Sequence, residues 1–137
     1  MMAAVHALIG AALGKACRSP TQAFFLGALS HLVTDGLPHR DLAIPQEAVL
    51  LVGALGLVTA TRGDDSRALL GAIGAVVPDL ENLIGRALKL PDQRLLLPTH
   101  SRLHGRELPT AWGQAPLALV CIAVLVLSRL VREGEPA

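Results

Sequence analysis

The chain has 137 residues, of which 52% are hydrophobic and 17% are charged, and its formal net charge is +1. An ordinary soluble domain carries about 25% charged residues, so this composition favours an integral membrane protein. The Lys and Arg residues lie between apolar runs and form no basic stripe, which argues against a nucleic-acid partner.

Five apolar segments bounded by helix-breaking residues predict helices over residues 2–17, 21–35, 46–61, 66–88 and 114–132. They are rich in Ala, Leu, Gly and Val and lack the alternation of strands, so the predicted fold class is all-α. We expect one helical membrane domain over residues 1–137, a compact bundle of four or five helices with a His/Asp cluster at helix ends. An irregular connection over about 88–113 contains one short predicted helix around residues 100–107.

Only two of these segments, residues 46–61 and 114–132, approach the roughly 20 apolar residues that a helix needs to cross a bilayer. The other three carry His6, His31 and Asp79, and an ionisable side chain is costly inside lipid. We therefore expect at least one of these three segments to be buried inside the bundle or to enter the membrane only in part.

The segment SHLVTDGLPHRD, residues 30–41, holds two histidines and two aspartates where the second predicted helix ends. His31 and Asp35 are four residues apart and share one helix face. A glycine and a proline then end the helix and leave His39 on the following turn. This arrangement is typical of a ligand cluster at a helix end.

Similar residues occur at three other places in the chain. His6 lies in the first apolar segment, Asp79 follows Pro78 in the fourth, and His100 and His104 form an H-x-x-x-H pair. Imidazole nitrogen and carboxylate oxygen are ligands of zinc, and of manganese or iron where carboxylates are numerous. Their joint occurrence predicts a divalent-metal site, most simply one for zinc.

Structural interpretations of the first group of residues stay open. His6 in an apolar helix is compatible with a core histidine bonded to a carbonyl group, and His31 with Asp35 is compatible with a buried ion pair. His39 is compatible with an exposed turn residue.

The remaining residues also have a structural interpretation. Asp79 after Pro78 is compatible with a capping residue, and His100 with His104 fits a basic helix that lies on anionic lipid headgroups. One metal site replaces all of these separate explanations, which is why we favour it.

Several segments resemble motifs of the small bacterial inner-membrane proteins known as YdjM-type membrane-bound metal-dependent hydrolases. LGALSHLVTDGLPH resembles their G-x-x-S-H-x-x-x-D segment, GAVVPDLEN resembles L-x-P-D-I-D, and the THS of residues 99–101 resembles the end of H-R-x-x-T-H-S. The order of the motifs differs, because the S-H-x-x-x-D segment comes first here. More loosely, the pattern is similar to all-α zinc phospholipase C and nuclease proteins. The resemblance implies metal-site positions at His6, His31, Asp35, Asp79 and His100.

The expected function is that of a metal-dependent membrane hydrolase that cleaves a phosphoester or ester, including one carried by a membrane lipid, with metal-activated water. We expect His104 to be an extra ligand or a proton shuttle, and His39 to support the metal ligands or to face the substrate. The expected location is the bacterial inner membrane, with several passes. Two alternatives remain: a metal or proton transport component, which needs these residues at mid-bilayer depth, and a structural membrane protein in which they only tie helices together.

Overall fold

The structure, a computed structural model, describes residues 1–63, 65–91 and 105–134. Within these ranges the chain forms the α-helices α1 (Ala3–Ala16), α2 (Pro20–Thr34), α3 (Ile44–Arg62), α4 (Ser66–Ala87) and α6 (Ala115–Glu133), and the 3-10 helix η2 (Ala111–Gln114) precedes α6. The described residues contain no β-strand, so the all-α prediction is confirmed. The ends of these five helices differ from the predicted ends by at most two residues.

The predicted short helix around residues 100–107 is wrong in its described part, because residues 105–107 are not helical. The rest of that segment lies outside the described residues. The N–H of His39 donates to Arg106 O at 3.1 Å, and the N–H of Leu108 donates to His39 O at 2.8 Å. This segment therefore uses its backbone groups against the loop that follows α2 and not within a helix.

Proline and serine explain where the helices begin. A proline stands in the first turn of α2, α3 and α6, where its missing N–H costs no helical hydrogen bond. The Ser19 hydroxyl also accepts a hydrogen bond from Gln22 N at 3.2 Å and caps α2. Pro78 is the exception, because it lies inside α4 directly before Asp79 and removes one N–H from the helix there.

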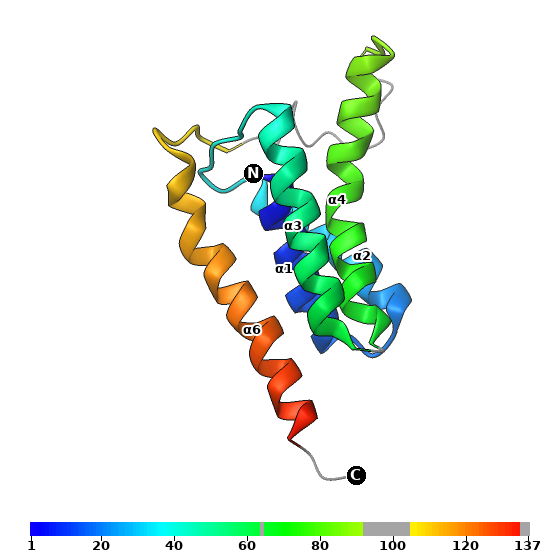
Figure 1. The fold of residues 1–137 in the computed structure, drawn as a ribbon. Coiled ribbons are helices and arrows are strands. Elements are labelled where there is room, and N and C mark those ends of the chain that lie inside the picture. The colour runs from blue at the N-terminus through cyan, green and yellow to red at the C-terminus, as the bar shows by residue number, and fades with distance from the viewer. Residues whose placement is uncertain (64, 92–104, 135–137) are drawn as a thin grey trace.

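Helix α1 is the centre of the bundle. It packs against α2, α3, α4 and α6, and nine of its fourteen residues are buried. Figure 1 shows that α1, α3 and α6 run away from the end where Met1 lies, whereas α2 and α4 run back toward it. We call these two ends of the bundle the Met1 end and the far end.

Glycines bring α1, α2 and α4 into direct backbone contact. A Cβ added to Gly71 would lie 2.1 Å from Gly10 O, and one added to Gly27 would lie 2.1 Å from Gly71 O. Neither distance is sterically possible, so only glycine fits at these positions while the backbones stay this close. The three helices that carry His6, His31 and Asp79 are thus the three that approach one another most closely.

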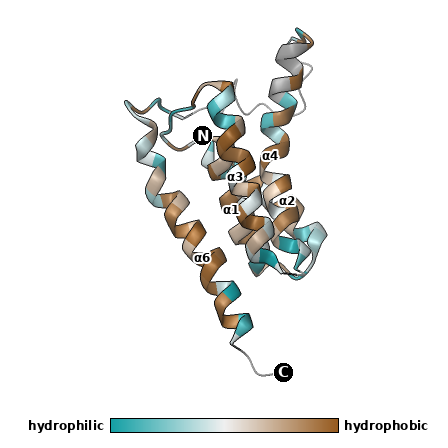
Figure 2. Ribbon diagram, viewed as in Figure 1, coloured by the Kyte–Doolittle hydropathy of each residue, from teal (hydrophilic) through white to brown (hydrophobic). Residues whose placement is uncertain are grey.

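The outer helices expose many large apolar side chains. Examples are Phe25 and Leu29 of α2, Val49 and Val52 of α3, Leu80 of α4, and Leu119 and Leu127 of α6. Figure 2 shows hydrophobic residues along the middle of α3 and α6 and hydrophilic ones at the far end. Two described segments, Ile44–Arg62 and Ala111–Glu133, are long and apolar enough to cross a membrane. They contain the two segments, residues 46–61 and 114–132, that by sequence approach the length needed to cross a bilayer.

The far end of the bundle is held by charged side chains. Arg67 Nε lies 2.9 Å from Asp65 Oδ1, and Arg132 Nη1 lies 3.7 Å from Asp65 Oδ2. Hydrogen bonds from Arg67 hold the pKa of the Asp65 carboxyl below its usual value. This carboxylate connects the turn after α3 to the last turn of α6.

We expect Gly71→Ala to destabilise the protein, because its Cβ would collide with the backbone of α1 at Gly10. Overpacking of this kind costs about 1–3 kcal/mol. Gly53→Ala on α3 is the control, since nothing lies within 4 Å of the added Cβ and Ala is about 1 kcal/mol more favourable than Gly in a helix. Thermal unfolding in detergent checks both variants. Equal changes in Tm would contradict the packing.

Candidate metal centre

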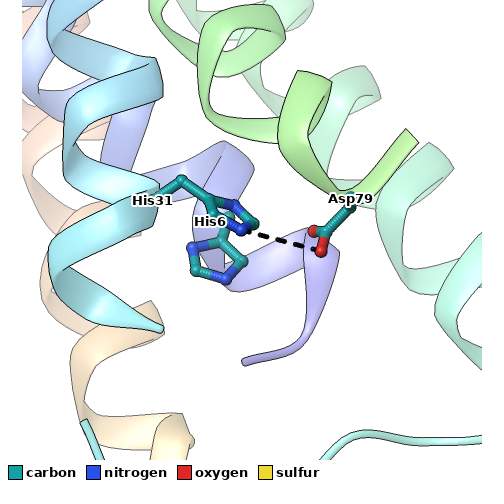
Figure 3. A group of neighbouring side chains, drawn as sticks. All are labelled: His6, His31 and Asp79. Atoms are coloured by element: carbon teal, nitrogen blue, oxygen red, sulfur yellow. Dashed lines mark ion pairs between the residues drawn. The ribbon is translucent and has the colours of Figure 1, made fainter. Parts of the chain in front are cut away.

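His6, His31 and Asp79 meet near the Met1 end of the bundle, and we call them the central group. They come from three helices, α1, α2 and α4. One candidate ligand atom from each residue lies within 4.8 Å of the other two. Figure 3 shows the two imidazoles one above the other, with Asp79 pointing toward them, and their ring centroids are 3.9 Å apart.

The close helix packing explains why these side chains meet. His31 lies one turn after Gly27 on the buried face of α2, and His6 lies one turn before Gly10 on α1. Both glycines contact α4 at Gly71. Asp79 lies two turns further along α4, at the level of the two histidines. Each polar residue therefore stands just beyond the backbone contact, on the side of the Met1 end.

Hydrogen bonds fix the tautomer of both histidines. Thr34 Oγ1 donates to Ser30 O at 2.8 Å, so it accepts from His6 Nδ1 at 3.1 Å. His31 Nδ1 donates to Ala75 O at 2.8 Å, because a carbonyl oxygen is only an acceptor. In their neutral forms both imidazoles therefore carry a lone pair on Nε2.

Both Nε2 atoms face carboxylates without bonding to them. His6 Nε2 lies 3.6 Å from Asp35 Oδ1, and His31 Nε2 lies 3.8 Å from Asp79 Oδ1. These distances are too long for hydrogen bonds, and in the part of the chain that the structure describes neither Nε2 has a hydrogen-bond partner. Two ligands at about 2.0–2.1 Å from a tetrahedral zinc are about 3.3 Å apart. The spacing therefore suits atoms that share a metal ion.

A bonded Nδ1 behind an inward Nε2 is the usual arrangement of metal-binding histidines. Both rings are fully buried, so bulk solvent does not reach Nε2. The interpretation of His6 as a core histidine bonded through Nδ1 accounts for one of its nitrogens and leaves the other unexplained. The central group has the donor set and the spacing to hold a divalent cation.

Asp35 lies beside the central group, and with His39 and Asp41 it forms what we call the loop group. The Asp35 carboxylate is fully buried and accepts a hydrogen bond from the Met1 amino group at 2.7 Å. His39 is only 1% exposed, so its interpretation as an exposed turn residue is wrong. The loop follows the end of α2, and backbone hydrogen bonds join it to the segment that begins at Gly105.

The structure brings together some of the predicted site residues. Of the five predicted metal positions, His6, His31 and Asp79 form the central group and Asp35 adjoins it, whereas His100 lies outside the described residues. His104, the predicted extra ligand or proton shuttle, also lies outside them. The predicted partner of His31 was Asp35. The structure shows a carboxylate from another helix, Asp79, beside it.

Sequence reasoning missed the residues that hold the start of α1. Glu47 Oε2 accepts from Ala3 N at 3.0 Å, and its Oε1 accepts from Leu42 N at 2.9 Å. Gln114 Oε1 accepts from Met2 N at 3.0 Å. The sequence signal was weak: one acidic residue in the first turn of an apolar helix and one amide before another.

Comparisons with known proteins identify no relative: no family model matches the chain, and neither do curated proteins or solved structures. The resemblance to YdjM-type hydrolases therefore stays a prediction from short motifs.

We expect metal-free His6 and His31 to be in the Nδ1–H tautomer when neutral, because Thr34 and Ala75 engage Nδ1. Thr34→Val removes the hydrogen-bond acceptor of His6 Nδ1 and should change the tautomer population of His6 but not that of His31. Thr34→Ser keeps a hydroxyl acceptor and should preserve the tautomer of His6. Long-range proton–nitrogen spectra of ¹⁵N-histidine-labelled protein in detergent, assigned with single His→Gln variants, check this. An Nε2–H tautomer at both residues would contradict the assignment.

Proposed function

We propose that this protein is an integral membrane hydrolase that uses a divalent metal to cleave a phosphoester or an ester. The central group carries the proposal: two buried imidazoles with bonded Nδ1 atoms turn Nε2 toward carboxylates, and its three ligand atoms gather within 4.8 Å. Burying such groups without a cation is costly. A bound metal would offset this cost.

The donor set favours zinc over other metals. Two imidazole nitrogens and one carboxylate oxygen are the ligands of many catalytic zinc sites, in which a fourth position stays open for water. Manganese and iron accept the same donors. The metal would lower the pKa of a bound water to about 7. Asp35 Oδ1 lies 3.6 Å from His6 Nε2, beside the central group.

The distribution of polarity supports a membrane location. Polar residues such as His6, His31 and Asp35 are buried near the Met1 end, whereas many large apolar side chains are exposed on the helices around them. A large exposed apolar surface marks a contact with lipid or with another protein. With helices of about 28 Å, α3 and α6 match the hydrocarbon thickness of a bilayer. We therefore propose a multi-pass protein of the bacterial inner membrane.

The depth of the site favours hydrolysis over transport. Ala3 at the start of α1 is bonded to Glu47 in the first turn of α3, so these helices begin at the same level. His6 lies three residues further, about 4.5 Å along the axis. A transport relay needs such residues near the middle of the bilayer, whereas a site about one turn below the end of the bundle can meet water and lipid headgroups.

We expect the wild-type protein, purified in detergent with a C-terminal tag, to bind at least one zinc, manganese or iron per chain. We expect Asp79→Asn to lose a metal from the central group, because the substitution makes one charged ligand neutral. Asp65→Asn is the matched control, since Asp65 lies at the far end among arginines. Elemental mass spectrometry measures the metal. Equal metal content in Asp79→Asn and in the wild type would contradict the central group as the site.

The same variants test the chemistry. We expect hydrolysis of phospholipids in mixed micelles, or of a soluble phosphodiester, to fall about 100-fold or more in Asp79→Asn and to persist in Asp65→Asn, because loss of a ligand costs at least as much as loss of its supporting residues. If metal binds at this site but no tested ester is hydrolysed, the proposal of a metal site stands and the proposal of a hydrolase is contradicted.

We expect the protein to remain in the membrane pellet after extraction with alkaline carbonate and to be released only by detergent, because its outer surface is apolar. Cell fractionation followed by immunoblotting of a C-terminal tag checks this. Release of folded, monodisperse protein by carbonate alone would contradict the membrane location. The metal site would then still be tested by the metal content of Asp79→Asn.

A further inference from the structure

The side chain of Lys15, in the last turn of α1, ends in a buried ammonium group. Among the described residues, Lys15 Nζ has no hydrogen-bond partner and forms no ion pair. Lysine usually extends its ammonium group into solvent while its carbon stem lies along the protein surface. Lys15 does the reverse, since the residue as a whole is only partly buried. An unpaired charge is costly to bury, so this ammonium group indicates an anion site.

The carboxylate that acts on Lys15, that of Asp65, already binds two arginines. Arg67 donates to Asp65 from Nε at 2.9 Å and from Nη2 at 3.1 Å, and Arg132 Nη1 lies 3.7 Å from Asp65 Oδ2. The charges of all three residues act on Lys15. We call Lys15, Arg67 and Arg132 the far-end cations. Within the described residues they share this one carboxylate, which leaves an excess of positive charge. The adjacent Asp64 lies outside the described residues.

Backbone carbonyl groups hold both arginines in place. Arg67 Nη1 donates to Cys17 O at 2.6 Å, and Arg132 Nη2 donates to Thr61 O at 3.0 Å. The Arg67 side chain is 36% exposed and the Arg132 side chain is 40% exposed. Both side chains are therefore fixed and yet accessible to an anion from outside the bundle. Arginine suits a phosphate group in particular, because its planar guanidinium group donates several hydrogen bonds at once.

An open pocket of about 370 Å³ adjoins the far-end cations through Cys17, whose carbonyl oxygen binds Arg67. The pocket is lined by Ala16, Cys17, Arg18, Gln22 and Leu26. Arg18 and Gln22 lie at the start of α2, whereas Leu26 lies one turn further along this helix, toward the Met1 end. The lining thus changes from polar to apolar with distance from the far end. This order matches a charged headgroup followed by an acyl chain.

From these observations we propose that the far-end cations bind the phosphate group of an anionic membrane lipid, whose acyl chain begins in the adjoining pocket. Each of the helices α1, α4 and α6 supplies one cation, so the bound phosphate connects three helices. The inference goes beyond the proposed hydrolysis, because this site lies at the opposite end of the bundle from the central group and needs no metal.

The choice of a lipid as the source of the phosphate rests on the proposed membrane location. The two segments long and apolar enough to cross a membrane are Ile44–Arg62 and Ala111–Glu133. Thr61 and Arg132, which bind each other at the far end, are the next-to-last residues of these segments. In a bilayer crossed by both segments, the far-end cations lie at the level of the headgroups. A free phosphate ion has the same chemistry at the cations but makes no use of the pocket.

The first test measures thermal unfolding of Lys15→Met in detergent without added lipid. Methionine has a side chain of similar length and no charge. Lys89→Met is the matched control, because Lys89 is exposed and follows the end of α4 on the Met1 side. We expect Lys15→Met to unfold at the same Tm as the wild type or at a higher one, since it removes an unpaired buried charge. A Tm below that of both the wild type and the control would overturn the unpaired ammonium group.

The second test adds phosphatidylglycerol to the same three proteins and measures Tm, and native mass spectrometry measures lipid affinity. We expect the lipid to raise the Tm of the wild type and of Lys89→Met, because a ligand of the folded state stabilises it. We expect Lys15→Met to bind the lipid about tenfold more weakly or worse, since a hydrogen bond to a charged group is lost. Diacylglycerol with the same acyl chains, which has no phosphate, should not change any Tm.

Two outcomes separate the parts of this proposal. Equal affinity for phosphatidylglycerol in all three proteins overturns the site. Displacement of the lipid by excess inorganic phosphate overturns the lipid as the preferred ligand and leaves a site for phosphate. Neither outcome affects the carbonate extraction or the metal content of Asp79→Asn, so failure here is distinct from failure of the proposed function.

Discussion

The candidate metal centre depends on the backbone contact between α1, α2 and α4. Gly10, Gly27 and Gly71 leave no room for a Cβ where these helices meet. Helices separated by ordinary side chains have axes 8–10 Å apart, and side chains as short as aspartate and histidine then meet less easily in the middle. Because each helix carries its polar residue on the Met1 side of this contact, the packing that brings the backbones together also gathers the central group. The glycines thus serve the site as much as the fold.

The second constraint is electrostatic. The interior of the Met1 end holds several ionisable groups, of which His6, His31 and Asp35 are completely buried. The structure satisfies one nitrogen of each imidazole with a fixed acceptor and leaves the other facing a carboxylate. An ordinary buried network places direct hydrogen bonds between such groups. Distances of 3.6–3.8 Å between Nε2 and carboxylate oxygen are long for such a network, and they suit atoms that could share a cation.

Local sequence signals predicted the helices, because proline, glycine and serine act within a turn of the helix end they determine. They also pointed to His6, His31 and Asp79. They did not predict that Asp79 would lie beside His31, since H-x-x-x-D spacing shows which residues share a face but not which helix packs on that face. The burial of His39 was also unpredictable, because it depends on backbone pairing with the segment around Arg106, almost seventy residues away.

The outer helices are connected to the site by side chains that accept hydrogen bonds from the start of α1. Glu47 of α3 accepts from Ala3 N, and Gln114 at the start of α6 accepts from Met2 N. These two bonds fix the level of α1 relative to the two segments that are long and apolar enough to cross a membrane. The level of α3 and α6 therefore determines the level of His6, which lies about one helical turn along α1 from the level at which α1 and α3 begin.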